Sequence, residues 1–103
     1  MAGDRDLLDE LIDERAASNP AFPGMVEAAY ERRRLLRALA KRREELGLSQ
    51  TQVAARMGTS QSSVARLESG EADARLSTIE RFSVALGVRL NWSLDDAPSP
   101  SQR

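Results

Sequence analysis

Four polar side chains stand close together near the middle of the chain and offer hydrogen-bonding groups suited to nucleic-acid bases. Glutamine matches the edge of adenine, arginine carries paired donors that match guanine, and serine bonds to either. Ser60 precedes them and is a preferred residue at a helix start, and a helix beginning over 60–62 presents free backbone N–H groups to a phosphate. The candidate base-reading residues are Gln61, Ser62, Ser63 and Arg66.

The rest of the sequence offers little for catalysis. The chain contains no histidine and no cysteine, its serines fall at predicted helix starts, and its acidic residues lie on predicted exposed helix faces without a glycine-rich phosphate loop. We therefore expect no catalytic residue, no metal site and no cofactor. Two alternatives to DNA binding stay open. The chain could be a generic four-helix core whose capping residues serve stability alone, or an adaptor that binds other proteins through the same helices.

Two short helices joined by a glycine-containing turn are expected to position the polar residues. The first begins at Ser49, where Gln52 has capping-box spacing, and ends at Gly58, which tolerates the left-handed conformation. The second runs over 60–70. Ala54 is small, as it must be where the second helix packs across the first. This is the pattern of the DNA-binding helix-turn-helix, whose second helix lies in the major groove.

Helical patterns flank this pair on both sides. Upstream, a long helix begins near Pro20 or Pro23, because proline is tolerated in a first turn, and continues to Leu46. Downstream, Ser77 and Glu80 have the spacing of a capping box, which predicts a helix that starts there and ends at a glycine. The fold class is therefore all-α, with one domain over 23–87.

The residues before this domain form an acidic arm, over 1–22. Residues 1–31 hold eight acidic and two basic side chains, whereas residues 32–89 hold twelve basic and six acidic. The positive part suits a phosphate backbone, and the negative part suits a basic protein. The arm also has an apolar stripe at helical spacing, which could instead pack on the domain or form a homodimer seam. The stripe consists of Leu7, Leu8, Leu11 and Ile12.

After the last predicted helix, apolar residues occur at every second position. This alternation favours a short strand over 88–94 that pairs with the same strand of a second subunit. A fifth helix starting near Asn91 is the alternative. Residues 95–103, with two prolines among serines, predict a disordered tail. The candidate dimerisation residues are Val88, Leu90, Trp92 and Leu94.

The segment LGLSQTQVAARMGTSQSSVARLESG, residues 46–70, resembles the helix-turn-helix of the phage repressor and Cro family, also called the XRE family. The resemblance covers 39–90 and implies a lambda-repressor-like helical bundle that binds double-stranded operator DNA. It implies a structural ion pair between Arg43 and Glu68. It also implies a phosphate contact from Gln50, base contacts from Gln61 and Ser62, and a base or backbone contact from Arg66. The full DNA-binding set that we predict is Gln50, Thr51, Ser60, Gln61, Ser62, Ser63 and Arg66.

The Asn-Pro-x-Phe motif over 19–22, followed by a long helix, is similar to HigA-type antitoxins of type II toxin–antitoxin pairs. This resemblance implies a protein that represses its own operon and inhibits a basic ribonuclease toxin of the RelE/HigB class. Because one small module rarely gives enough affinity, we expect a homodimer on a palindromic operator. The alternative is a stand-alone phage-type regulator without a toxin. No run approaches the ~20 apolar residues of a membrane span, so we expect a cytoplasmic protein. The toxin-binding residues that we predict are Leu7, Leu8, Leu11, Ile12 and Phe22.

Overall fold

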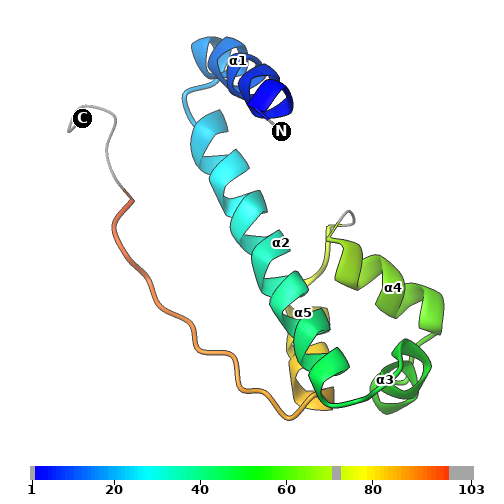
Figure 1. Cartoon of the computed structure of the whole chain (residues 1–103). Helices are drawn as coiled ribbons and strands as arrows, with labels where there is room; N and C mark the ends of the chain where they lie inside the picture. The colour runs from blue at the N-terminus through cyan, green and yellow to red at the C-terminus, as the bar shows by residue number, and fades with distance from the viewer. Residues whose placement is uncertain (1, 71–72, 98–103) are drawn as a thin grey trace.

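The computed structural model describes residues 2–70 and 73–97, and for residues 2–7 and 16 it describes the backbone alone. The described residues form five helices and no strand, so the prediction of an all-α chain is confirmed. Helices α2 to α5 form a bundle, and α1 lies apart from it, beside the N-terminal end of α2 (Figure 1). The helices are α1 (Ala2–Ser18), α2 (Phe22–Glu45), α3 (Gln50–Met57), α4 (Gln61–Ser69) and α5 (Leu76–Ala85).

One apolar core holds α2, α3, α4 and α5 together. Leu36 of α2, Val53 of α3, Val64 of α4 and Phe82 of α5 are fully buried, so every helix of the bundle contributes to its centre. Burying one such side chain contributes roughly 1.5–3 kcal/mol, and the core therefore fixes α4 against α3. The buried apolar residues are Leu36, Leu39, Val53, Ala54, Met57, Val64, Leu67, Ile79, Phe82 and Leu86.

Local sequence signals set the ends of α3 and α4. The Ser49 hydroxyl accepts a hydrogen bond from the backbone N–H of Gln52 at 3.0 Å, and the Gln52 side-chain oxygen accepts one from the N–H of Ser49 at 2.8 Å. The predicted capping box is therefore present. Gly58 ends α3 in the left-handed conformation with φ 71°. The Ser60 hydroxyl caps α4 by accepting from the N–H of Ser63 at 3.2 Å.

Gly70 ends α4 at a point where the chain requires glycine for two reasons. Its φ of 69° is left-handed, a conformation that side chains with a Cβ rarely adopt. A Cβ at this position would also lie 2.9 Å from Cγ of Arg33 on α2. The C-terminal end of α4 therefore packs closely against α2.

The start of α5 differs from the prediction. The helix begins at Leu76, and Arg75 is its N-cap residue, without a side-chain cap. The backbone at Arg75 is extended (ψ 145°), and its carbonyl accepts hydrogen bonds from the N–H groups of Thr78 and Ile79. Ser77 is therefore already inside the first turn, where its hydroxyl cannot cap the helix. The prediction of a capping box between Ser77 and Glu80 was wrong.

The segment over 88–97 forms neither the predicted strand nor the alternative helix from Asn91 in the described residues (Figure 1). Val88 and Leu90 pack on the core, whereas Trp92 is 57% exposed and Leu94 is 103% exposed. A strand needs a neighbouring strand for its backbone hydrogen bonds, and the described residues of this one chain supply none. The strand therefore stays a prediction about a dimer. Residues 98–103 of the predicted tail lie outside the described residues.

The start and the end of the long upstream helix agree closely with the prediction. α2 begins at Phe22 with Pro23 in its first turn, in agreement with the predicted start near Pro20 or Pro23, and it ends at Glu45, one residue before the predicted end. No helix in the described ranges is long and apolar enough to cross a lipid bilayer.

Candidate nucleic-acid interface

The outer face of α4 carries the polar residues that the sequence singled out. Val64 and Leu67 point into the core, and this orientation leaves the other side of the helix open. Thr51 in the first turn of α3 is exposed as well, and Gln50 beside it is half-buried. The bundle thus presents an uncovered polar surface over the starts of α3 and α4. The exposed α4 residues are Gln61, Ser62, Ser63 and Arg66.

Three serine hydroxyls cluster at the N-terminus of α4. The Ser60 hydroxyl lies 3.1 Å from that of Ser62 and 2.8 Å from that of Ser63. Because the Ser60 cap occupies the N–H of Ser63, a phosphate at this helix end would bind to the backbone N–H groups of Gln61 and Ser62. The hydroxyls can rotate, and they can donate to or accept from a base edge.

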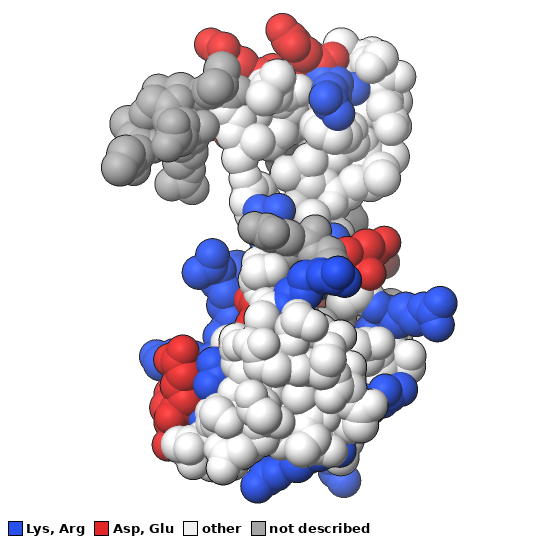
Figure 2. Space-filling view, turned by 90° about the vertical axis from the view of Figure 1, so that its right-hand side faces the viewer, with Lys and Arg blue, Asp and Glu red and all other residues white. Residues whose placement is uncertain are grey.

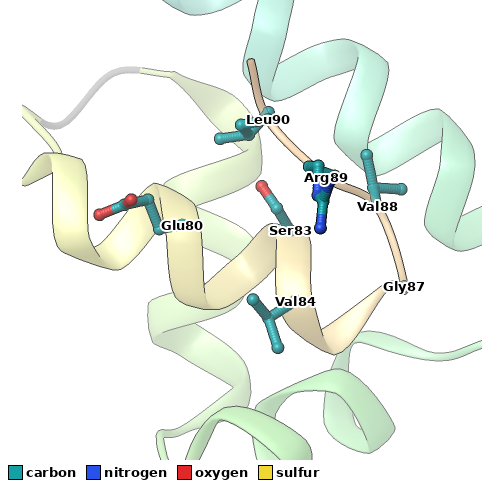
Figure 3. A pocket seen from close by; sticks show the side chains of 7 residues that line it. All are labelled: Glu80, Ser83, Val84, Gly87, Val88, Arg89 and Leu90. Atoms are coloured by element: carbon teal, nitrogen blue, oxygen red, sulfur yellow. The ribbon is translucent and has the colours of Figure 1, made fainter. Parts of the chain in front are cut away.

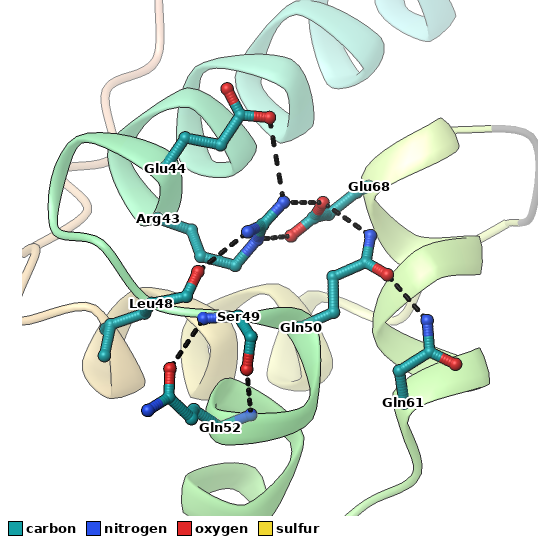
Figure 4. Close-up of polar contacts among 8 residues, drawn as sticks. All are labelled: Arg43, Glu44, Leu48, Ser49, Gln50, Gln52, Gln61 and Glu68. Carbon is teal, nitrogen blue, oxygen red and sulfur yellow. Dashed lines mark hydrogen bonds and ion pairs between the residues drawn. The ribbon is translucent and has the colours of Figure 1, made fainter.

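The ion pair that the resemblance implied is formed (Figure 4). Nε of Arg43 donates to Glu68 Oε2 at 2.6 Å, and Nη2 donates to Oε1 at 3.0 Å. Nη1 of Arg43 also donates to the carbonyl of Leu48 at 2.8 Å. The two side chains are only 12% and 8% exposed. The hydrogen bond to Glu68 is the main cause that raises the pKa of Arg43. The pair joins the C-terminal end of α2 to α4.

A chain of hydrogen bonds extends from this ion pair to the surface of α4 (Figure 4). The amide nitrogen of Gln50 donates to Glu68 Oε1 at 3.0 Å, and the amide nitrogen of Gln61 donates to Gln50 Oε1 at 2.7 Å. Each glutamine NH₂ group has a second hydrogen. Gln61 therefore keeps a donor and its carbonyl for the paired hydrogen bonds to adenine, and Gln50 keeps a donor for a phosphate.

Sequence reasoning missed Arg75 as a further cation beside this surface. Ser63 and Arg66 of α4 line a hollow of about 350 Å³ together with Asp73, Arg75 and Thr78, which lie before and at the start of α5. The hollow therefore lies beside the base-reading residues and has arginines on two of its walls. Arg75 precedes a helix start that is distant from α4 in the sequence, so no local pattern connected it to the site.

Figure 2 shows how charged side chains are distributed over one face of the molecule. Lysine and arginine side chains lie at several places along the edge of the bundle, aspartate and glutamate side chains lie at its left edge and upper right, and further carboxylates lie on α1 at the top. The face of the bundle in this view is largely uncharged at its centre. An uncharged centre with cations along parts of its edge suits DNA, whose bases lie between two phosphate backbones.

The remaining predicted site residues lie outside this surface. In the arm, Leu8 and Leu11 are exposed, whereas Ile12 and Phe22 are half-buried. The side chain of Leu7 is outside the described residues. In the C-terminal segment, the predicted dimerisation residues divide into two partly buried and two exposed side chains.

Comparison with known proteins gives two matches of different extent. The helix-turn-helix family model matches residues 39–93. Antitoxin HigA1 of Mycobacterium tuberculosis, from strains CDC 1551 / Oshkosh and ATCC 25618 / H37Rv, is 42% identical over 98 residues. The alignment covers 92% of this chain, and the chain spans 66% of the length of these curated relatives. No solved structure gives a significant match.

Proposed function

Because the chain belongs to the helix-turn-helix family, we propose that it binds DNA with α4 in the major groove and represses transcription. The observation that carries the proposal is the hydrogen-bond chain that links Gln61 to the Arg43–Glu68 ion pair. A base-reading side chain loses less conformational entropy on binding when its geometry is already held in the free protein. Gln61 is exposed and nevertheless held in place.

Phosphate contacts would set the position of α4 in the groove. Gln50 and Thr51 lie at the start of α3, and Arg66 and Arg75 line the hollow beside α4. These residues can contact phosphates on both sides of the bases that α4 reads. The excess of basic residues over 32–89 would attract DNA before any specific contact forms.

We further propose that the protein is the antitoxin of a type II pair and neutralises a basic ribonuclease toxin of the RelE/HigB class. The likeness to two proteins named antitoxin supports this, and so does the acidic arm. The arm residues assigned to the toxin are Leu7, Leu8, Leu11, Ile12 and Phe22. The proposed role is binding without catalysis, and a DNA ligand supports a cytoplasmic location. A stand-alone regulator is the second candidate, favoured if no toxin binds.

A dimer would bind a palindromic operator with half-sites about one helical turn apart. The C-terminal segment supplies a surface for it: a hollow of about 410 Å³ lies between α5 and this segment (Figure 3). Val84 of α5 is exposed beside it, and Val88 and Leu90 form part of its wall. Trp92 and Leu94 continue the segment with exposed apolar area, which favours pairing with the same segment of a second copy.

DNA binding is tested by titrating the full chain onto the DNA upstream of its gene, with excess random DNA and two salt concentrations. Selective, saturable binding is expected, and Gln61→Ala should weaken it by roughly 1–3 kcal/mol. Gln52→Ala is the matched control, because this exposed glutamine lies in a helix cap outside the proposed readout surface. Equal operator affinity of Gln61→Ala and wild type would refute the assignment of α4 as the reading helix.

The antitoxin role is tested by co-expressing the full chain with the reading frames that adjoin its gene. The expected result is a stable complex with a small basic protein whose ribonuclease activity disappears in the complex. A chain that binds its operator but neither binds nor inhibits such a protein would be a stand-alone regulator.

A further inference from the structure

The N-terminal half of α2 lies outside the core of the bundle. The buried residues of α2 are Leu36 and Leu39, both in its second half. Figure 1 shows the first half projecting from the bundle, with α1 lying beside it. Two large side chains on this half, Met25 and Tyr30, are exposed. They stand five residues apart and so on different sides of the helix, and of the two only Tyr30 lines a hollow with α1.

Hydrogen bonds fix the corner between α1 and α2. The N–H of Asn19 donates to the carbonyl of Arg15 at 2.9 Å, and the carbonyl of Asn19 accepts from the N–H of Phe22 at 3.0 Å. The Asn19 side chain accepts from the N–H of Ala21 at 3.1 Å. The guanidinium of Arg15 lies 5.7 Å from the centre of the Phe22 ring, close enough for a cation–π contact. The two helices are therefore joined by a structured turn.

Inside this corner is a hollow of about 380 Å³, which we call the α1–α2 cleft. Its walls are Leu8 and Ile12 of α1 and the Tyr30 ring of α2, and Asp9 and Arg34 complete it. The arm thus turns part of its apolar stripe toward α2. Leu11, which does not line the cleft, is exposed.

Exposed carboxylates lie on both helices that form the cleft. Asp9 lines the cleft, as does Arg34, and Glu27 stands one helical turn before Tyr30 on the same side of α2. A partner whose surface is basic would gain charge pairs with both helices at once, and its approach would be accelerated by the field. The other exposed carboxylates of the two helices are Glu10, Asp13 and Glu14 of α1 and Glu31 of α2.

We infer that the α1–α2 cleft, and not the arm alone, is the docking site for the toxin, which inserts an apolar side chain between Leu8, Ile12 and Tyr30. The inference rests on the proposed antitoxin function, because it names the surface that the toxin covers. α1 stays helical and packed on α2 when the toxin binds. An apolar anchor in a pocket with charges at its margin is the usual arrangement of a binding hot spot.

The first test compares an exposed side chain in the N-terminal half of α2 with one at the C-cap of this helix. Tyr30 and Leu46 are 42% and 43% exposed, so Tyr30→Ser and Leu46→Ser change side chains of similar fractional exposure. The affinity of the purified full-length variants for the purified basic toxin is measured by calorimetry. Tyr30→Ser should weaken binding about tenfold, the size of a hot-spot loss, whereas Leu46→Ser should change it less than about twofold. Tyr30→Phe keeps the ring and should bind as wild type.

The second test changes charge and leaves the apolar walls intact. Glu27→Lys places a cation next to the cleft, and Glu45→Lys makes the same change at the other end of α2. Glu27→Lys should weaken toxin binding several-fold at low salt, with a smaller effect at high salt because charges are screened. Glu45→Lys should leave toxin binding unchanged. If Tyr30→Ser lowers the helix content in circular dichroism, the comparison of Glu27→Lys with Glu45→Lys tests whether the toxin binds at the cleft.

The outcomes separate this inference from the function on which it rests. If wild type inhibits the toxin and Leu11→Ser weakens binding, but Tyr30→Ser and Glu27→Lys bind as wild type, the arm acts alone and the inference is overturned while the antitoxin role stands. If wild type binds no toxin, the antitoxin role itself fails. Loss of affinity in both Tyr30→Ser and Glu27→Lys, with unchanged controls, supports the cleft.

Discussion

The Arg43–Glu68 ion pair should be a principal determinant of the stability of the bundle. Arg43→Met keeps much of the side-chain volume but removes two hydrogen bonds to Glu68 and one to the carbonyl of Leu48. The Glu68 carboxylate, only 8% exposed, would then keep the amide of Gln50 as its hydrogen-bond donor. Removing one partner of a buried pair costs about 3–5 kcal/mol, because the other charge stays buried. Small domains have only about 5–15 kcal/mol in total.

The assay is urea denaturation followed by circular dichroism, with Arg42→Met as the matched control. Arg42 is the preceding residue, its side chain is 50% exposed, and its nitrogen lies 3.7 Å from a carboxylate oxygen of Glu45. Such a surface pair contributes about 0–1 kcal/mol. We therefore expect Arg43→Met to lower the free energy of unfolding by at least about 3 kcal/mol and Arg42→Met by less than about 1 kcal/mol. Equal, small losses in both variants would refute the structural role of the pair.

Three further predictions concern the α4 surface and its supports. Gly70→Ala should destabilise the fold more than Gly58→Ala in thermal unfolding, because both have positive φ but only Gly70 has Arg33 within 2.9 Å of an added Cβ; equal losses would count against close packing of α4 on α2. Gln50→Ala should reduce both operator affinity and base selectivity in a gel-shift titration, since Gln50 holds Gln61, and unchanged selectivity would count against this. Arg75→Ala should weaken binding to all DNA sequences alike and lower the salt slope by about one, and a sequence-dependent loss would contradict a phosphate contact.

The ends of α3 and α4 could be predicted because they depend on neighbouring residues. A serine with a glutamine three residues later forms a capping box, and a glycine allows the left-handed end, regardless of the rest of the fold. The same rule failed at Ser77. There the turn before α5 places the first accepting carbonyl at Arg75, and this turn depends on how the chain returns to the core.

Contacts between distant residues could not be predicted from spacing. The hydrogen bond from Gln50 to Glu68 connects α3 with α4. The hollow that Arg66 and Arg75 line lies between α4 and the start of α5. The Arg43–Glu68 pair was anticipated only through a family resemblance. The corner that turns Ile12 toward Tyr30 also depends on tertiary geometry. Trp92 and Leu94 of the C-terminal segment are exposed in a single chain, and the partner that we propose for this segment is a second copy of the chain.

The most direct test of DNA reading by α4 is the binding of wild type and Gln61→Ala to a set of operator variants, each with one base pair changed. We expect wild type to discriminate against the wrong base at the position facing Gln61 by roughly 1–3 kcal/mol, and Gln61→Ala to lose discrimination at that position alone. Identical base preferences of the two proteins at every position would show that Gln61 does not read a base.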